Sequence, residues 1–143
     1  MPSRKASIAK ITVPRPAGII KRDRLFRLID QGSRLPVEWM AAPAGTGKTL
    51  LAASYIDSRS LRCVWYQIDE GDRDLASFFY YLGLAAKKAA PRYRTALPLL
   101  TPEYLQGIPV FTRRYFEEFF QTEAGNRICQ TSEESACGFL GNQ

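Results

Sequence analysis

The chain has 143 residues, of which 45% are hydrophobic and 24% are charged, and its net charge is +6. This length allows one ordinary core and is too short for two domains of usual size. Three cysteines without a C-x-x-C spacing and the absence of histidine exclude a zinc finger and a histidine-dependent mechanism. No apolar run approaches the roughly 18 residues of a membrane span, and residues 1–9 lack the apolar core of a secretion signal, so we expect a cytoplasmic protein without membrane contact.

Residues 1–22 are predicted to form a basic, extended arm. Eight Lys and Arg side chains between residues 1 and 27 face only one acid, Asp23. No DNA-binding signature accompanies them, so a solvated arm is favoured over a contact with nucleic acid. The prolines of the segment Ile11–Pro16 favour an extended path across a neighbouring surface.

A short helix and a strand are predicted next. The helix runs from about Asp23 to Asp30, and Gly32 is well placed to end it. Its expected packing face consists of Leu25, Leu28 and Ile29. Residues 36–41, PVEWMA, are mostly apolar and predict a strand that leads into the following turn.

Residues 42–49, APAGTGKT, match the phosphate-binding loop pattern, with Ala42 in its first small position. Gly45 and Gly47 let the backbone curl around a chain of phosphates without a side chain in the way. Lys48 is expected to place its ammonium against the β- and γ-phosphates, and the Thr49 hydroxyl is expected to bind Mg²⁺. A helix that begins at about Leu50 would direct its positive end at the same anion. The predicted nucleotide-binding residues are Ala44, Gly45, Thr46, Gly47, Lys48, Thr49 and Leu50, with Thr49 as the metal ligand.

A second strand and a long helix follow the loop and its helix. Residues 62–69 are strand formers throughout, which suits a sheet covered on both faces. The acidic turn at 69–74 permits a magnesium or general-base interpretation, but Asp72 or Asp74 as a helix cap explains it equally well and is preferred. The helix then continues to Pro91. Its apolar stripe consists of Leu75, Phe78, Phe79, Leu82, Ala86 and Ala89.

Two more helices are predicted before residue 122. Thr101, Pro102 and Glu103 form a good helix start, which Gly107 and Pro109 keep short. The second helix spans about 109–122 and has an aromatic stripe that requires a partner surface. The stripe consists of Phe111, Tyr115, Phe116, Phe119 and Phe120.

Several of these segments resemble the MalT-like large transcriptional regulators of the LuxR type, whose N-terminal module is a STAND-class ATPase (signal-transduction ATPases with numerous domains). The resemblance covers about residues 8–120. It depends on ITVPRP at 11–16, APAGTGKT at 42–49, VWYQIDEGD at 64–72, LTPEYL at 100–105 and FTRRYF at 111–116.

The resemblance implies an α/β fold, namely a P-loop NTPase three-layer sandwich with a parallel sheet, in a switch whose ATP and ADP states favour different assemblies. It divides the chain into the arm at 1–22, a partial P-loop NTPase domain at 23–120 and a tail at 121–143. It assigns the phosphates to the loop backbone and Lys48, Mg²⁺ to Thr49, and the border of the adenine and ribose to the segment Ile11–Pro16 and Arg22.

The tail departs from the family pattern. After Phe120 the family continues into an apolar strand that ends in an acidic residue, whereas residues 121–143 are polar and show little periodicity. We therefore expect a flexible tail, as in a truncated or frame-shifted product. The resemblance further implies a strand order in which the first two strands are not neighbours, so we also expect an incomplete sheet. Such a chain is expected to expose apolar surface and to self-associate.

Three functions remain open from the sequence. The first is an ATP- or ADP-binding fragment of a STAND regulator with little or no turnover and no DNA-binding domain of its own. The second is a small P-loop kinase or ATPase, whose catalytic acid or arginine we do not find; Glu38 and Asp69 are the nearest acids. The third is a non-binding remnant that acts as an interaction module.

Overall fold

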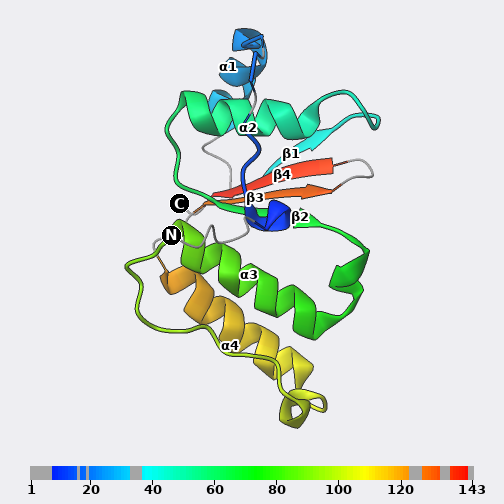
Figure 1. Cartoon of the computed structure of the whole chain (residues 1–143), viewed down its shortest axis with the longest axis vertical. Coiled ribbons are helices and arrows are strands. Elements are labelled where there is room, and N and C mark those ends of the chain that lie inside the picture. Colours follow the sequence, from blue (N-terminus) through cyan, green and yellow to red (C-terminus); the bar gives the residue numbers. More distant parts are fainter. Residues whose placement is uncertain are drawn as a thin grey trace, which may run out of the picture.

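The computed structural model describes residues 8–15, 17–18, 20–32, 37–122, 127–132 and 136–141. Four strands form a single sheet, and helices cover both of its faces (Figure 1). The helices are α1 (Asp23–Gly32), α2 (Lys48–Ser58), α3 (Leu75–Ala89) and α4 (Ile108–Gln121). The strands are β1 (Val37–Ala41), β2 (Val64–Ile68), β3 (Arg127–Ser132) and β4 (Ala136–Gly141). Three short 3₁₀ helices complete the described elements: η1 (Ala9–Ile11), η2 (Glu70–Arg73) and η3 (Pro102–Tyr104).

The strand order in the sheet is β1-β4-β3-β2. β2 and β3 pair in parallel, whereas β4 pairs antiparallel with both β3 and β1. The prediction of a parallel sheet is therefore wrong, because β3 and β4 follow one another closely in the chain and run in opposite directions. β1 and β2 are not neighbours, as predicted, and these pairings make them point the same way.

The strands β3 and β4 lie in the segment for which we predicted a flexible tail without a strand, and that prediction is wrong for the described residues. The two strands occupy the middle of the sheet between β1 and β2. Each has only six residues. They pair with each other, but their outer partners, β2 for β3 and β1 for β4, are distant in sequence. Their stability therefore depends on tertiary pairing rather than on a strong local pattern.

The two faces of the sheet carry separate cores, and β2 contributes to both. Val64 and Tyr66 pack with α3, α4 and η1 on one face. Trp65, between them in sequence, packs with α1, α2 and Cys129 of β3 on the other face. All three β2 side chains are buried, because successive residues of a strand point to opposite faces. This confirms the prediction of a strand covered on both sides.

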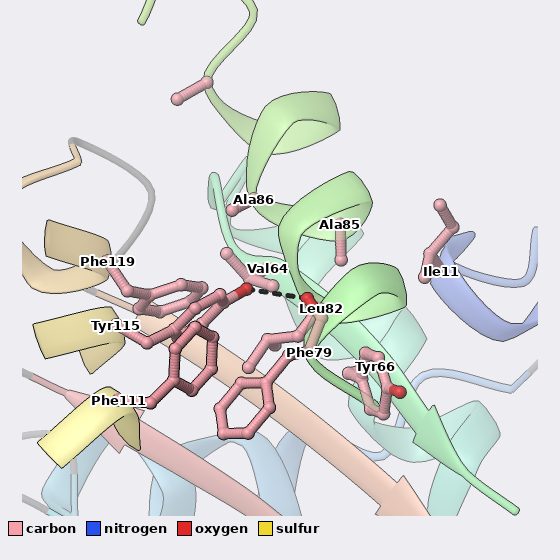
Figure 2. Close-up of a cluster of buried hydrophobic side chains, with 11 residues drawn as sticks. Ile11, Val64, Tyr66, Phe79, Leu82, Ala85, Ala86, Phe111, Tyr115 and Phe119 are labelled. Atoms are coloured by element: carbon pink, nitrogen blue, oxygen red, sulfur yellow. Dashed lines mark hydrogen bonds between the residues drawn. The ribbon is translucent and has the colours of Figure 1, made fainter. Parts of the chain in front are cut away.

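The aromatic face of α4 packs on α3, which is the partner surface that the sequence required. Phe111, Tyr115 and Phe119 are fully buried, and the ring of Phe79 on α3 lies 4.9 Å from that of Phe111 and 4.7 Å from that of Tyr115 (Figure 2). The Tyr115 hydroxyl donates a hydrogen bond of 2.9 Å to the Phe79 carbonyl oxygen. Phe120, which we also predicted on this face, is largely exposed.

The predicted position of the first helix is confirmed, but its buried face differs in part from the prediction. α1 begins at Asp23 and ends at Gly32, close to the predicted bounds. Phe26 and Ile29 are its buried residues, whereas Leu28 is exposed. Within the described residues, no helix is long and apolar enough to cross a membrane.

Candidate phosphate-binding site

The loop at 42–47 connects the end of β1 to the start of α2, which is the strand, turn and helix order expected of a phosphate-binding loop. Gly45 has a φ of +78° and Gly47 a φ of +83°. Both values lie in the left-handed region that L residues with a side chain rarely adopt. A Cβ atom added at Gly45 would meet nothing within 4 Å, so the backbone conformation, and not crowding, requires glycine at this position.

The start of α2 has open hydrogen-bond donors. Gly47 is the N-cap of the helix and provides no side-chain cap. The bond from Leu51 N to Gly47 O, 2.8 Å long, is the first of the helix. The N–H groups of Lys48, Thr49 and Leu50 precede this bond, so they lack intrahelical partners. These donors and the helix dipole together favour an anion at this end.

Lys48 folds back over the loop from which it projects. Its Nζ atom donates to the carbonyl oxygens of Ala42, at 2.7 Å, and of Pro43, at 2.9 Å. The Thr46 hydroxyl also donates to Pro43 O, at 2.9 Å. The ammonium is thus held at the loop by neutral acceptors, which a phosphate would replace with a stronger, charged partner. Pro43 to Thr46 are exposed, and Thr49 is half-buried, so the loop is open to solvent.

A small cavity of about 70 Å³ lies beside the loop, between the start of α1 and the first turns of α2. It is lined by Ile20, Arg22, Phe26, Gly47, Leu50, Leu51 and Ser54. A Cβ atom added at Gly47 would lie 3.9 Å from Arg22 Nη2, so the structure places Arg22 next to the loop. An apolar cavity of about 150 Å³ holds a benzene ring, so this cavity has room for the edge of a base only.

The other segment that the resemblance assigns to the adenine and ribose lies elsewhere. Ile11 is buried in the core against α3, and Val13 packs against the core beneath α1 and α2. Pro16 lies outside the described residues. Ile20, Phe26 and Ser54 line the cavity beside the loop, although the sequence did not predict them there. For Ser54, the helical spacing from Gly47 and Leu50 along one face of α2 was the available signal.

Neither of the two acids nearest to the loop in sequence lies at its phosphate side. Glu38 is near the start of β1, and its carboxylate lies against Gly32, where a Cβ atom would be 2.7 Å from Glu38 Oε1. Burial, aided by the negative charge of Asp30, raises the pKa of Glu38 above its usual value. Asp69 follows β2 at the same edge of the sheet as the loop, but three strand spacings, about 14 Å, separate β1 from β2.

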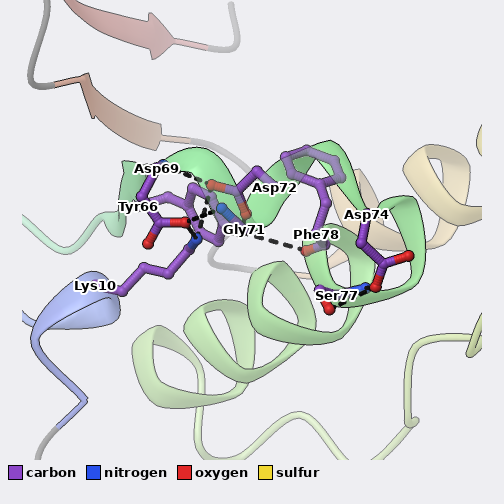
Figure 3. A network of polar contacts seen from close by, with 8 residues as sticks. All are labelled: Lys10, Tyr66, Asp69, Gly71, Asp72, Asp74, Ser77 and Phe78. Carbon is purple, nitrogen blue, oxygen red and sulfur yellow. Dashed lines mark hydrogen bonds and ion pairs between the residues drawn. The ribbon is translucent and has the colours of Figure 1, made fainter.

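Asp69 and Asp72 instead form a network with Lys10 of η1 (Figure 3). Lys10 Nζ lies 2.8 Å from Asp69 Oδ1 and 2.7 Å from Asp72 Oδ2. The Tyr66 hydroxyl donates to Asp72 Oδ1 at 2.6 Å. Burial by itself raises the pKa of Asp72, but the hydrogen bonds from Lys10 and Tyr66 outweigh it and hold that pKa below its usual value.

This network corrects one prediction and confirms another. Lys10 was expected in a solvated arm, yet its side chain is only 11% exposed, because two carboxylates and the rings of Tyr66 and Tyr81 surround it. The acidic turn serves as a set of helix caps, as preferred from the sequence: Asp69 and Asp72 cap η2, and Asp74 accepts from Ser77 N at the start of α3. Within the described residues, no group of three His, Cys, Asp or Glu could hold a metal ion.

The fold and the loop together define an α/β protein with a glycine turn that presents a lysine and an open helix start. Comparison with known proteins gives related transcriptional regulators. Over 82 residues the chain is 35% identical to the HTH-type transcriptional regulator MalT of Vibrio campbellii (strain ATCC BAA-1116) and to that of Vibrio parahaemolyticus serotype O3:K6 (strain RIMD 2210633). It is 34% identical, also over 82 residues, to the MalT regulator of Vibrio cholerae serotype O1 (strain ATCC 39315 / El Tor Inaba N16961).

The similarity covers part of this chain and a small part of each relative. The matched residues make up 57% of this chain and 9% of each MalT protein. No family model and no solved structure matches the chain. The chain is therefore similar to one short stretch of these regulators.

Proposed function

We propose that the chain binds ATP or ADP with Mg²⁺ through the loop at 44–50 and belongs to a STAND-type, signal-transducing transcriptional regulator of the cytoplasm. The observation that carries the proposal is the start of α2, where Gly47 in the left-handed conformation leaves the first helical N–H groups without a side-chain cap. Lys48, at the same place, supplies the positive charge. A chain of phosphates is bound by backbone donors, a helix dipole and an ammonium that meet at one point.

Each residue of the loop has a distinct part in this proposal. The ammonium of Lys48 would leave the carbonyl oxygens of Ala42 and Pro43 and pair with the β- and γ-phosphates. The Thr49 hydroxyl would bind the Mg²⁺ that bridges them. Arg22, beside Gly47, and the cavity edge at Phe26 would contact the ribose and base.

Binding with little turnover is the expected behaviour. Hydrolysis needs a positioned water and compensation of the transition-state charge. Among the described residues, Glu38 lies at the far end of β1 and Asp69 is committed to Lys10 and to the cap of η2. The chain is thus proposed as a P-loop NTPase-type nucleotide switch. Its similarity to regulators named MalT supports the regulatory setting, and DNA contact is not part of the proposal for this chain.

Thermal unfolding with and without Mg-ATP and Mg-ADP tests the proposal. A ligand that binds only the folded state at about 100 times its Kd stabilises that state by about 2.7 kcal/mol. We expect such a shift for the native chain and its loss in Lys48→Ala. Lys87→Ala is the matched control, because Lys87 also donates to a main-chain carbonyl, that of Tyr93 at 2.7 Å, but lies on α3.

The native fluorescence of the chain gives a second readout. It has two tryptophans: Trp65 is buried in the core that contains Phe26, whereas Trp39 is 67% exposed on β1. In a Trp39→Phe background, saturable nucleotide binding is expected to change the Trp65 emission. No nucleotide effect in either readout would contradict the proposal, and steady turnover that Lys48→Ala abolishes would favour a small P-loop enzyme instead.

A further inference from the structure

A second, larger cavity lies on the α3 side of the sheet, away from the phosphate loop. Its volume is about 270 Å³, and it is formed by the later turns of α3 and by the connection from Ala90 to Leu99 that follows this helix. Figure 1 shows this connection leaving α3 and running towards α4. Phe79, Leu84 and Ala86 on the helix and Leu97, Pro98 and Leu99 on the connection form mainly apolar walls.

The size of the cavity suits a small ligand. Close-packed interiors contain few voids larger than a water molecule. An apolar cavity of about 150 Å³ binds benzene, so 270 Å³ has room for about 10 non-hydrogen atoms. The cavity is accessible from solvent, since Leu99 at its edge is 60% exposed and Arg94, Thr95 and Ala96 are exposed as well.

The charged residues that line the cavity are all positive. Lys87 and Arg94 line it, and no acidic residue is among its lining residues. The ammonium of Lys87 already donates to the Tyr93 carbonyl oxygen at 2.7 Å. In the described part of the chain, no carboxylate forms an ion pair with Arg94. The guanidinium of Arg94 is therefore the group that can receive an anion, and it offers several donors for a carboxylate.

We propose that this cavity is a binding site for a small amphipathic carboxylate, whose apolar body fills the space between α3 and the 90–99 connection and whose carboxylate pairs with Arg94. A free phosphate would leave the apolar walls unfilled, and a nucleotide exceeds the about 10 non-hydrogen atoms for which the cavity has room. The positive edge favours an anion over a neutral or cationic ligand. The site is separate from the phosphate loop, so this proposal does not depend on the proposed nucleotide binding.

Octanoate is the probe, because its chain and carboxylate match the size and charge of the cavity. We expect saturable binding of one octanoate per chain by isothermal titration calorimetry. Octanol, with the same chain and no charge, and butyrate, with the charge and a short chain, are each expected to bind at least about tenfold more weakly, since a charge-assisted hydrogen bond or a few buried methylenes each account for such a factor.

Three variants separate this site from general adsorption. Arg94→Gln is expected to weaken octanoate binding about tenfold. Arg92→Gln is its matched control, because Arg92 is an exposed neighbour that does not line the cavity, and it is expected to leave binding unchanged. Ala96→Trp places a large side chain at an exposed position of the lining and is expected to block binding while circular dichroism shows the native fold.

The proposal is overturned if the native chain shows no saturable octanoate binding. It is also overturned if Arg94→Gln and Arg92→Gln weaken binding equally, because the effect would then be one of overall charge. Unchanged binding in folded Ala96→Trp would place the octanoate elsewhere on the protein and would likewise end the proposal.

Discussion

Lys10 shows how a single residue acquires a role that its sequence neighbourhood does not indicate. In the sequence it is one of eight basic residues near the N-terminus. In the structure it joins η1 to the end of β2, through Asp69 and Asp72, and lies 5.2 Å from the centre of the Tyr66 ring. A charge held by two carboxylates and two aromatic rings fixes the path of the N-terminal segment across the sheet.

Replacement of Lys10 by Met is expected to destabilise the protein by about 2 kcal/mol at pH 7, the scale of a lost charged hydrogen bond. Most of this loss belongs to Asp72, whose side chain is only 7% exposed and would be left without its cation. Asp69 contributes less, because it is about half exposed and solvent screens its charge. Urea unfolding at several pH values measures the difference.

The pH dependence of that difference follows from the carboxylate. The folded-state pKa of Asp72 is below its usual value, so the stability it contributes is present above an unfolded-state pKa of about 3.9 and is lost as the pH falls further. The gap between native and Lys10→Met is therefore expected to shrink below about pH 4. Lys88→Met is the control, since Lys88 contacts the same segment at Thr12 Oγ1 from an exposed position. Equal losses in the two variants, or a gap as large at pH 3 as at pH 7, would contradict this account.

At the scale of elements, local signals predict the helices well and the later strands poorly. Asp74 caps the start of α3 by accepting a hydrogen bond from Ser77 N, and α1 ends at Gly32. Such caps and the helical spacing of apolar residues are contained in a short stretch of sequence. β3 and β4 pair with each other locally, but their sequences carry no clear alternation, and their places in the sheet are set by β2 and β1, which are far away along the chain.

Removal of β3 and β4 tests whether these strands are part of the fold. A chain that ends at Thr122 keeps the helices α1 to α4 but loses the two strands between β1 and β2. Exposed strand edges and an uncovered face of α1 and α2 then remain, so we expect no cooperative thermal transition by circular dichroism. A shortened chain that melts like the native one would show that the strands are dispensable.

A point substitution examines the same elements without shortening the chain. Cys129 of β3 is fully buried in the core beneath α1 and α2, so Cys129→Asp buries a charge and is expected to destabilise strongly, by about 3 kcal/mol or more. Cys63→Asp is the matched control, because Cys63 is only half-buried before β2. If the two substitutions change the stability equally little, Cys129 is not in the folded core and the prediction is contradicted.

For the whole molecule, the expected self-association remains a prediction, but its structural basis changes. The sequence placed the exposed apolar surface on the aromatic helix, whereas α4 buries Phe111, Tyr115 and Phe119 against α3. Val110 and Phe120 on α4 stay exposed, but among the described residues the largest exposed apolar side chain is Trp39 on β1. Within the described residues β1 lies at the end of the sheet, and an edge strand with an exposed aromatic residue favours pairing with another chain.

Sedimentation velocity over a range of concentrations measures this association. We expect the mass of the native chain to rise with concentration, and Trp39→Lys to remain monomeric, since a lysine on an edge strand opposes pairing. Leu28→Lys provides the comparison, because it adds the same charge at an exposed leucine on α1 and is expected to associate like the native chain. A native chain that is monomeric at every concentration would refute the prediction.

Short patterns of neighbouring residues are sufficient to predict several parts of this protein. The glycines that adopt positive φ, the position of Lys48 at the helix start and the aromatic stripe of α4 all follow from patterns a few residues long. Tertiary structure alone decided the mixed sheet, the insertion of β3 and β4 between β1 and β2, the burial of Lys10 and the distance of Glu38 and Asp69 from the loop. The places of the strands and of Lys10 depend on contacts between residues about 60 to 100 positions apart. The free energy of these contacts comes from shared burial and hydrogen bonding that no short pattern encodes.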